Sequence, residues 1–195
     1  LTPNTTYAYR VGTEGYWSEV AYFTTAPTNE PDASEEFTFI YMTDSHIMNQ
    51  AYVDDARMCA TAAAQYVPEA RFCVFPGDFV ETGTNRNSEW EWERWFDEAL
   101  QPVIQQMPIV PTDGNHDDSE NLNYSYHFNT DNQFKENAHI KPQFDGTTYS
   151  FMYGDVLFLV YSLQDYWKGS YSLSSLTSTY LTNDVGNWFR EQVQA

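Results

Sequence analysis

The stretch IVPTDGNHDD, residues 109–118, begins as a short apolar strand and ends in a turn that carries an amide, an imidazole and three carboxylates. Surface loops usually hold such groups apart in water, so their concentration on one turn predicts a cation site. Two earlier stretches have the same form: FTFIYMTD (37–44) leads into a turn with a histidine, and RFCVFPGD (71–78) leads into a turn with a glutamate. The chain therefore contains three strands that each end in a polar turn.

Helical patterns separate these three strands. Residues 52–67 place apolar side chains at helical spacing, and Pro68 predicts the end of that helix. Residues 88–107 form a second amphipathic segment, which Pro102 is expected to kink or break and whose tryptophans are expected to pack in the core. This β-α-β-α-β order predicts an α/β fold, a parallel sheet covered by helices, with the strand at 37–44 buried on both faces.

The other segments have weaker patterns. Residues 1–27 predict two strands around a glycine-containing turn, with Tyr7, Tyr9 and Val11 on one face. A main domain is predicted over residues 37–195. The remaining expectations are a polar linker at 28–36, a long loop or insertion at 118–145, a strand pair around Gly154-Asp155 that includes Tyr149, Tyr153 and Tyr161, and the start of a helix at 182–195.

The polar turns are expected to meet in space. The carboxyl ends of parallel strands lie at one edge of a sheet, and open α/β sheets bind their ligands there. Carboxylate, amide and imidazole donors together suit Mn, Fe or Zn better than Cu(I), and Ca alone would not call for histidine. Asp78 could bridge two such cations, and two cations roughly 3.5–4 Å apart form a clamp for in-line attack on phosphorus. The candidate site residues are Asp44, His46, Asp78, Glu81, Asn115 and His116.

Three motifs in register resemble the calcineurin-like metallophosphoesterase family: D-x-H at 44–46, G-D-x-x-E at 77–81 and G-N-H-D at 114–117. The resemblance covers residues 37–195. It implies that Asp44 and His46 hold the first metal, that Asp78 bridges two metals and that Asn115 binds the second. A hydroxide bridging the metals would then attack the phosphorus of a phosphate mono- or diester.

The same resemblance implies roles for two residues that do not bind metal. His116 would donate a proton to the leaving oxygen or stabilise the transition state. Glu81 would accept a hydrogen bond from His116 and raise its pKa. The alternative reading of Glu81 is a solvated loop acid, and the alternative for the whole chain is a non-catalytic interaction module that retains the fold.

The N-terminal segment LTPNTTYAYRV resembles a fibronectin type III strand, with Tyr7 in the place of the tyrosine corner. Such a module before the main domain further resembles the purple acid phosphatase group. That group has a tyrosine ligand where this chain has Glu81 and lacks a histidine where this chain has His46, so we expect no tyrosinate-to-iron colour. The family also supplies further histidines downstream of this sequence, so we expect a chain truncated at both ends.

Composition and net charge argue against several classes of binding partner. The net charge of −19 argues against duplex nucleic acid and anionic membranes, and a phosphate substrate would need bound metal to invert the local field. No apolar run is long enough to predict a membrane span. We expect a secreted, periplasmic or cell-surface protein, although its two glycosylation sequons, at Asn4 and Asn123, also arise by chance.

Several single residues receive ordinary structural interpretations. Cys59 and Cys73 are expected to be buried free thiols. Asp113 is expected to shape its turn, Asp117 and Asp118 to be capping or solvated acids, and His127 and His139 to be surface or core histidines.

Overall fold

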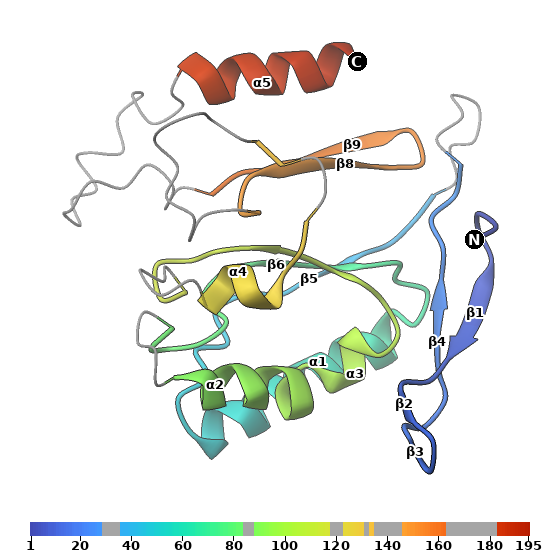
Figure 1. Ribbon diagram of the computed structural model, residues 1–195, viewed down its shortest axis with the longest axis vertical. Coiled ribbons are helices and arrows are strands. Elements are labelled where there is room, and N and C mark those ends of the chain that lie inside the picture. The colour runs from blue at the N-terminus through green and yellow to red at the C-terminus, as the bar shows by residue number, and fades with distance from the viewer. Residues whose placement is uncertain (29–35, 84–87, 118–122, 131–132, 135–145, 163–182) are drawn as a thin grey trace.

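The computed structural model in Figure 1 describes residues 1–28, 36–83, 88–117, 123–130, 133–134, 146–162 and 183–195. The three predicted strands are confirmed as one parallel sheet in the order β5-β6-β7, with Tyr41 opposite Val74 and Val74 opposite Val110. Their bounds are β5 (Ile40–Tyr41), β6 (Cys73–Pro76) and β7 (Ile109–Thr112).

The prediction that the first strand is buried on both faces is wrong. Only two of its expected residues form β5, and the Tyr41 side chain is 64% exposed. β5 is the edge strand of the three-stranded sheet, and its successive side chains point to opposite faces, so that Ile40 is buried on one face while Tyr41 is open to solvent on the other. Its apolar character therefore does not distinguish this edge strand from a central one.

The helices follow the predicted segments closely. Helix α1 (Gln50–Tyr66) begins at Asn49, whose side chain accepts a hydrogen bond from the Ala51 N–H, and it ends before Pro68. The second segment is broken as predicted, into α2 (Glu89–Arg94), the π-helical turn η1 (Trp95–Ala99) and α3 (Gln101–Ile104). Pro102 lies in the first turn of α3, where its missing N–H costs no intrahelical bond.

The sheet is the middle of a layered sandwich. Figure 1 shows α1, α2 and α3 on one side of it and the antiparallel pair β8 (Tyr149–Tyr153) and β9 (Val156–Val160) on the other, with α5 (Asn183–Gln194) outermost. The larger core packs between sheet and helices and includes the fully buried Trp92 and Trp95, as predicted. A second, aromatic core around Phe72 packs against β8. Helices therefore cover one face of the sheet, and a strand pair covers the other.

The predicted strand pair and the predicted C-terminal helix are both confirmed. Tyr149 and Tyr153 lie in β8, and Tyr161 follows the end of β9. The predicted long loop contains a short helix, α4 (Asn123–His127). Residues 128–130 and 133–134 of that loop are also described. The rest of it, including Asp118 and His139, and most of the predicted linker lie outside the described ranges.

The N-terminal segment forms an antiparallel pair of β1 (Thr6–Tyr9) and β4 (Ala21–Thr24), with β2 (Gly12–Thr13) and β3 (Tyr16–Trp17) as a small hairpin between them. Tyr7 and Tyr9 share the face that contacts Phe23, as predicted, but Val11 is 65% exposed. The Tyr7 hydroxyl accepts a hydrogen bond from the backbone N–H of Thr2 at 2.8 Å, the type of contact that a tyrosine corner makes. The fibronectin-like assignment of this segment stays a prediction.

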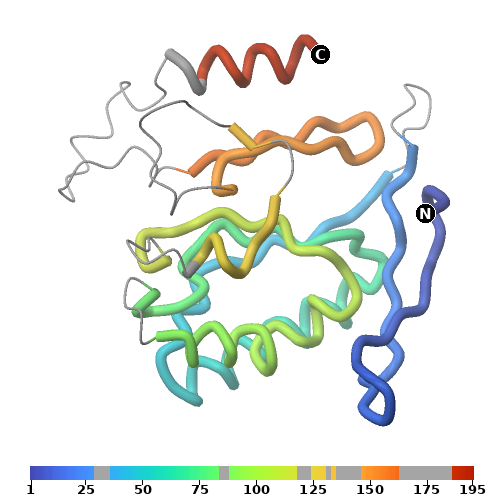
Figure 2. The backbone as a smooth tube through the Cα atoms, viewed as in Figure 1, coloured from blue at the N-terminus to red at the C-terminus, as the bar shows by residue number. Residues whose placement is uncertain are grey.

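The N-terminal strands run beside the main domain, as the smooth trace in Figure 2 shows. The Tyr9 hydroxyl donates a hydrogen bond across this boundary to the Gln105 carbonyl oxygen at 3.0 Å.

In the part of the chain that the structure describes, no helix has the length and apolar content needed to cross a bilayer.

The two cysteines differ in environment, and the expectation that both are buried is wrong for Cys59. Both thiols are free, Cys59 is exposed on α1 and Cys73 is fully buried in β6. Burial raises the pKa of Cys73 to about 12, so almost no thiolate is present at neutral pH. We expect a thiol reagent to modify the exposed Cys59 rapidly in the native protein and to modify both cysteines in denaturant. Equal rates for both thiols in the native state would contradict this packing.

Candidate metal centre

The turns that follow β5 and β6 are held together by backbone hydrogen bonds. The Asp44 N–H donates to the Gly77 carbonyl at 3.3 Å, and the His46 N–H donates to the Asp78 carbonyl at 3.1 Å. Asp44, His46 and Asp78 all have a positive φ, between 43° and 58°, which non-glycine residues rarely adopt. Such strain persists only where the surroundings fix it, and it concentrates at functional sites.

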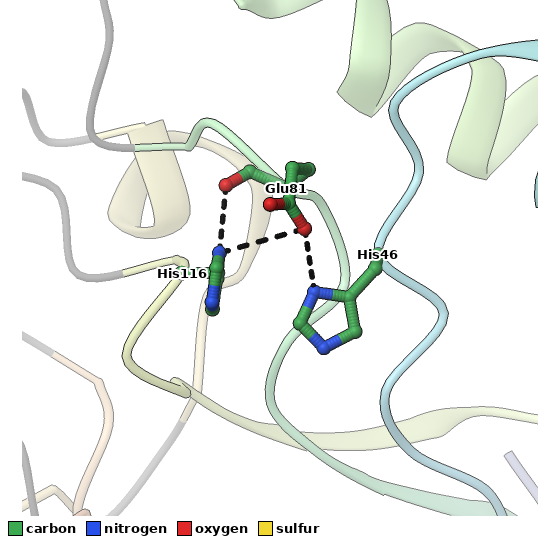
Figure 3. Close-up of side chains that lie close together, drawn as sticks. All are labelled: His46, Glu81 and His116. Carbon is green, nitrogen blue, oxygen red and sulfur yellow. Dashed lines mark hydrogen bonds and ion pairs between the residues drawn. The ribbon is translucent and has the colours of Figure 1, made fainter.

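His46 lies at the centre of the cluster. Figure 3 shows its Nδ1 directed at the Glu81 carboxylate, 2.8 Å from Oε2. Because a carboxylate only accepts, Nδ1 carries the hydrogen of this bond, and Nε2 faces the other way. A histidine that binds metal through one nitrogen usually donates its other N–H in this manner.

The free nitrogen of His46 faces two carboxylates. Its Nε2 lies 3.6 Å from Asp44 Oδ1 and 3.7 Å from Asp78 Oδ2. These separations are too long for hydrogen bonds. They match ligand atoms that are each about 2.0–2.2 Å from a shared cation. Asp44, His46 and Asp78 thus form a group that fits one metal ion.

The charge of the cluster also fits a cation. Four carboxylates lie in or directly beside it: Asp44, Asp78, Glu81 and Asp117. Within the described ranges, the ion pairs of these groups involve His46 and His116 and no lysine or arginine. A bound cation would offset this concentration of negative charge.

The third turn joins the cluster through Asp78. The His116 backbone N–H donates to Asp78 Oδ1 at 2.9 Å, and the His116 ring stands edge-on to the His46 ring with centroids 4.6 Å apart. Asn115 is half-buried in the same turn. Its assignment as a ligand of a second metal stays a prediction, as do the roles predicted for the other site residues.

His116 contacts Glu81 differently from the prediction. Its Nδ1 lies 2.8 Å from the Glu81 backbone carbonyl oxygen and 3.6 Å from the carboxylate, so the hydrogen bond goes to the backbone (Figure 3). The carboxylate is instead paired with His46, which also argues against a merely solvated Glu81. Burial opposes ionisation of His116, but the Glu81 carbonyl and the charges of Asp78, Glu81 and Asp117 raise its pKa above the usual value.

Asp117 is neither solvated nor peripheral. It is fully buried, and its Oδ1 accepts from the Phe79 N–H at 2.9 Å and the Val80 N–H at 3.3 Å, while Oδ2 accepts from the Gly114 N–H at 2.9 Å. Burial raises its pKa to about 7, against the effect of these hydrogen bonds. The predicted solvated acid is therefore wrong, and the predicted capping role holds in that Asp117 accepts backbone N–H groups of both the second and the third turn.

Glu91 is a residue of the site region that the sequence interpretation missed. It is buried on α2 and accepts hydrogen bonds from the Glu81 N–H at 3.1 Å and the Thr82 N–H at 2.8 Å. A signal was available, since Glu91 stands four residues before the buried Trp95 and therefore on the apolar stripe of its helix. An acid on that stripe requires polar partners.

His127 lies away from the cluster. Its ring stacks on Trp92 at 4.7 Å, and its Nε2 lies 3.2 Å from Glu89 Oε1. Burial lowers the pKa of His127, against the effect of Glu89. This placement agrees with the interpretation of His127 as a core histidine.

Two glycines bring the second and third turns into contact. A Cβ on Gly114 would overlap the Asp78 carboxylate and backbone nitrogen, and a Cβ on Gly77, which has a φ of +96°, would overlap the Gly114 backbone. The G-D and G-N-H motifs therefore need glycine because their backbones meet here.

We expect a Gly114→Ala variant to displace Asp78 and to weaken metal binding by about tenfold or more, the scale of lost outer contacts at metal sites. Titration with Mn²⁺ measures this. Gly186→Ala is the matched control, since a Cβ there meets only the Arg190 guanidinium at ordinary contact distance. Equal affinity in the two variants would contradict the close packing of the turns.

Comparisons with known proteins bear on the family and the fold of this chain. The sequence profile described as calcineurin-like phosphoesterase matches residues 37–194. A comparison with curated proteins finds no match. Among solved structures, the purple acid phosphatase isolated from yellow lupin (Lupinus luteus) seeds is similar, with a TM-score of 0.57 and 16% identity. That match covers 94% of this chain and 34% of that one, so the chain spans about a third of its length. The profile match covers most of the chain, and the chain belongs to the calcineurin-like phosphoesterase family.

Proposed function

We propose that this chain carries the metal-binding half-site of a phosphoesterase that hydrolyses phosphate mono- or diesters. The observation that carries the proposal is the placement of His46, whose Nδ1 is held by Glu81 while its Nε2 faces Asp44 and Asp78. Asp44, His46 and Asp78 would hold one metal ion, and Asp78 and Asn115 a second. Bound Mn, Fe or Zn would supply a nucleophile at neutral pH and neutralise the charge of the phosphate.

The chain's own residues supply orientation and a proton. Glu81 acts as a positioning residue, because its carboxylate fixes the ring of His46. His116 donates its Nδ1–H to the Glu81 carbonyl, which leaves Nε2 for proton transfer to the leaving oxygen or for stabilising the transition state.

A second candidate function is a non-catalytic interaction module. The observation in its favour is that the described histidines near the acids are His46 and His116, while His127 is engaged with Trp92 and Glu89. Such a module would keep the fold and bind metal weakly or not at all.

One assay separates the two candidates. The chain is stripped with a chelator, reloaded with Mn²⁺, Fe²⁺ or Zn²⁺, and assayed with p-nitrophenyl phosphate and its bis ester. The phosphoesterase predicts hydrolysis that depends on added metal and is lost on chelation. Stoichiometric metal binding without hydrolysis of either ester, or no metal binding, would favour the module.

Iron loading gives a further prediction. The motif resemblance places Glu81 where purple acid phosphatases have a tyrosine ligand, and its carboxylate is paired with His46, so we expect no tyrosinate-to-iron absorption band. The visible spectrum of the iron-loaded protein measures this. A strong band that disappears on chelation would overturn the assignment of Glu81.

A further inference from the structure

Two buried carboxylates hold the loop that follows Asp78. The four consecutive backbone N–H groups of residues 79–82 all donate to them. The first two donate to Asp117, and the next two donate to Glu91. The Glu81 N–H also lies 3.2 Å from the Ile47 carbonyl oxygen, in a parallel bridge between Ile47 and Val80. Buried acids thus fix the backbone of this loop in addition to that bridge.

Glu91 reaches the loop from a different element. It lies on α2, is 2% exposed, and its Oε1 also accepts from the Thr82 hydroxyl at 2.6 Å. Its partners in the described part of the chain are these neutral donors, and the ion pairs found there do not include it. A buried carboxylate without a cationic partner is stabilised only by its hydrogen bonds, so it holds their donors firmly.

The bonds of Glu91 lead to His116 through a single peptide group. The Thr82 N–H, which donates to Glu91 at 2.8 Å, and the Glu81 carbonyl, which accepts from His116 Nδ1 at 2.8 Å, are the two ends of that group. A charged acceptor at the N–H end polarises the peptide and makes its carbonyl oxygen a stronger acceptor. Glu91 therefore acts on the imidazole without touching it.

We propose that Glu91 is a positioning residue for His116, acting through the Glu81–Thr82 peptide to keep Nδ1 protonated and Nε2 available on the side of the metal cluster. The consequence for catalysis rests on the proposed function, in which His116 assists the leaving oxygen. A merely structural Glu91 would affect all substrates alike.

The first readout is kinetic and uses three variants. Glu91→Ala removes the acceptor, Glu91→Gln keeps an acceptor oxygen but removes the charge, and Glu93→Ala is the matched control on the exposed face of the same helix. Substrates are p-nitrophenyl phosphate, whose leaving group needs little protonation, and phenyl phosphate, whose leaving group needs more.

For Glu91→Ala we expect kcat on phenyl phosphate to fall by about tenfold or more, with a much smaller loss on p-nitrophenyl phosphate and unchanged KM and metal content. Glu91→Gln should lose about fivefold on phenyl phosphate, the difference between a charged and a neutral hydrogen bond. Glu93→Ala should match the wild type. Equal losses on both esters, or loss of metal, would overturn the proposal.

The second readout does not depend on activity. A two-bond proton–nitrogen correlation spectrum of the histidine rings, recorded at alkaline pH, reports which nitrogen of His116 carries the hydrogen. We expect Nδ1–H in the wild type and a mixture of tautomers in Glu91→Ala. If the wild type hydrolyses no ester, the proposed function fails while this spectrum still decides the role of Glu91.

Folding of the variants does not limit the test. If Glu91→Ala does not fold, Glu91→Gln decides, because its amide can still accept from both loop N–H groups and donate to the Thr82 hydroxyl. Unchanged kinetics on phenyl phosphate in Glu91→Gln, together with an unchanged His116 spectrum in each folded Glu91 variant, would overturn the proposal.

Discussion

An Asp78→Asn variant is expected to lose at least about 100-fold in kcat/KM, together with most of its bound metal. Asp78 is the residue that joins the three turns, because its Oδ2 faces His46 Nε2 at 3.7 Å and its Oδ1 accepts from the His116 N–H at 2.9 Å. Asparagine keeps the size and one acceptor but removes the charge that a bridging ligand supplies. Elemental analysis and steady-state kinetics measure the two effects.

The matched control is Asp55→Asn, the same substitution at an exposed acid of α1. It should leave metal content and activity unchanged, even though it changes net charge equally. Full activity in Asp78→Asn would reject the catalytic interpretation of the cluster.

The second large effect is expected for His116→Gln, with a loss of about 10²–10⁴ in kcat, the range for removal of a general acid or base. Metal content should remain, because the contact with Asp78 comes from the backbone N–H, which the substitution keeps. Activity against phenyl phosphate, whose leaving group needs protonation, and elemental analysis of the same preparation measure both quantities.

His127→Gln is the control for this variant, since His127 lies between Trp92 and Glu89 outside the cluster. It should retain metal and most of the activity. If His116→Gln released the metal instead of slowing turnover, His116 would be a ligand, and its assignment to proton transfer would be wrong.

Much of the fold could be predicted from periodicity and from prolines. Helix α1 follows the apolar spacing that ends at Pro68, and the break near Pro102 falls where that residue loses no hydrogen bond. The exposure of β5 could not be predicted, because the position of a strand within a sheet depends on partners distant in sequence. The same holds for the strand pair that covers the second face of the sheet.

The candidate site could be predicted as far as its residues but not its hydrogen bonds. Parallel strand ends place Asp44, His46 and Asp78 together by topology alone. The Glu81 carboxylate pairs with His46, and the Glu81 backbone carbonyl pairs with His116. This arrangement depends on side-chain rotamers and on backbone direction, which motif spacing does not encode. Burial of Asp117 depends on tertiary packing of the turns, so a solvated acid and a structural one look alike in sequence.

The central claim is that the turns after β5 and β6 assemble one cation site around His46 and Asp78, to which the turn after β7 is held through Asp78. Anomalous diffraction from crystals of the full chain soaked in Mn²⁺ tests it most directly. The account predicts an anomalous peak between His46 Nε2 and the carboxylates of Asp44 and Asp78, within bonding distance of all three. Well-ordered density for these side chains with no peak between them, or a peak elsewhere on this acidic surface alone, would contradict it.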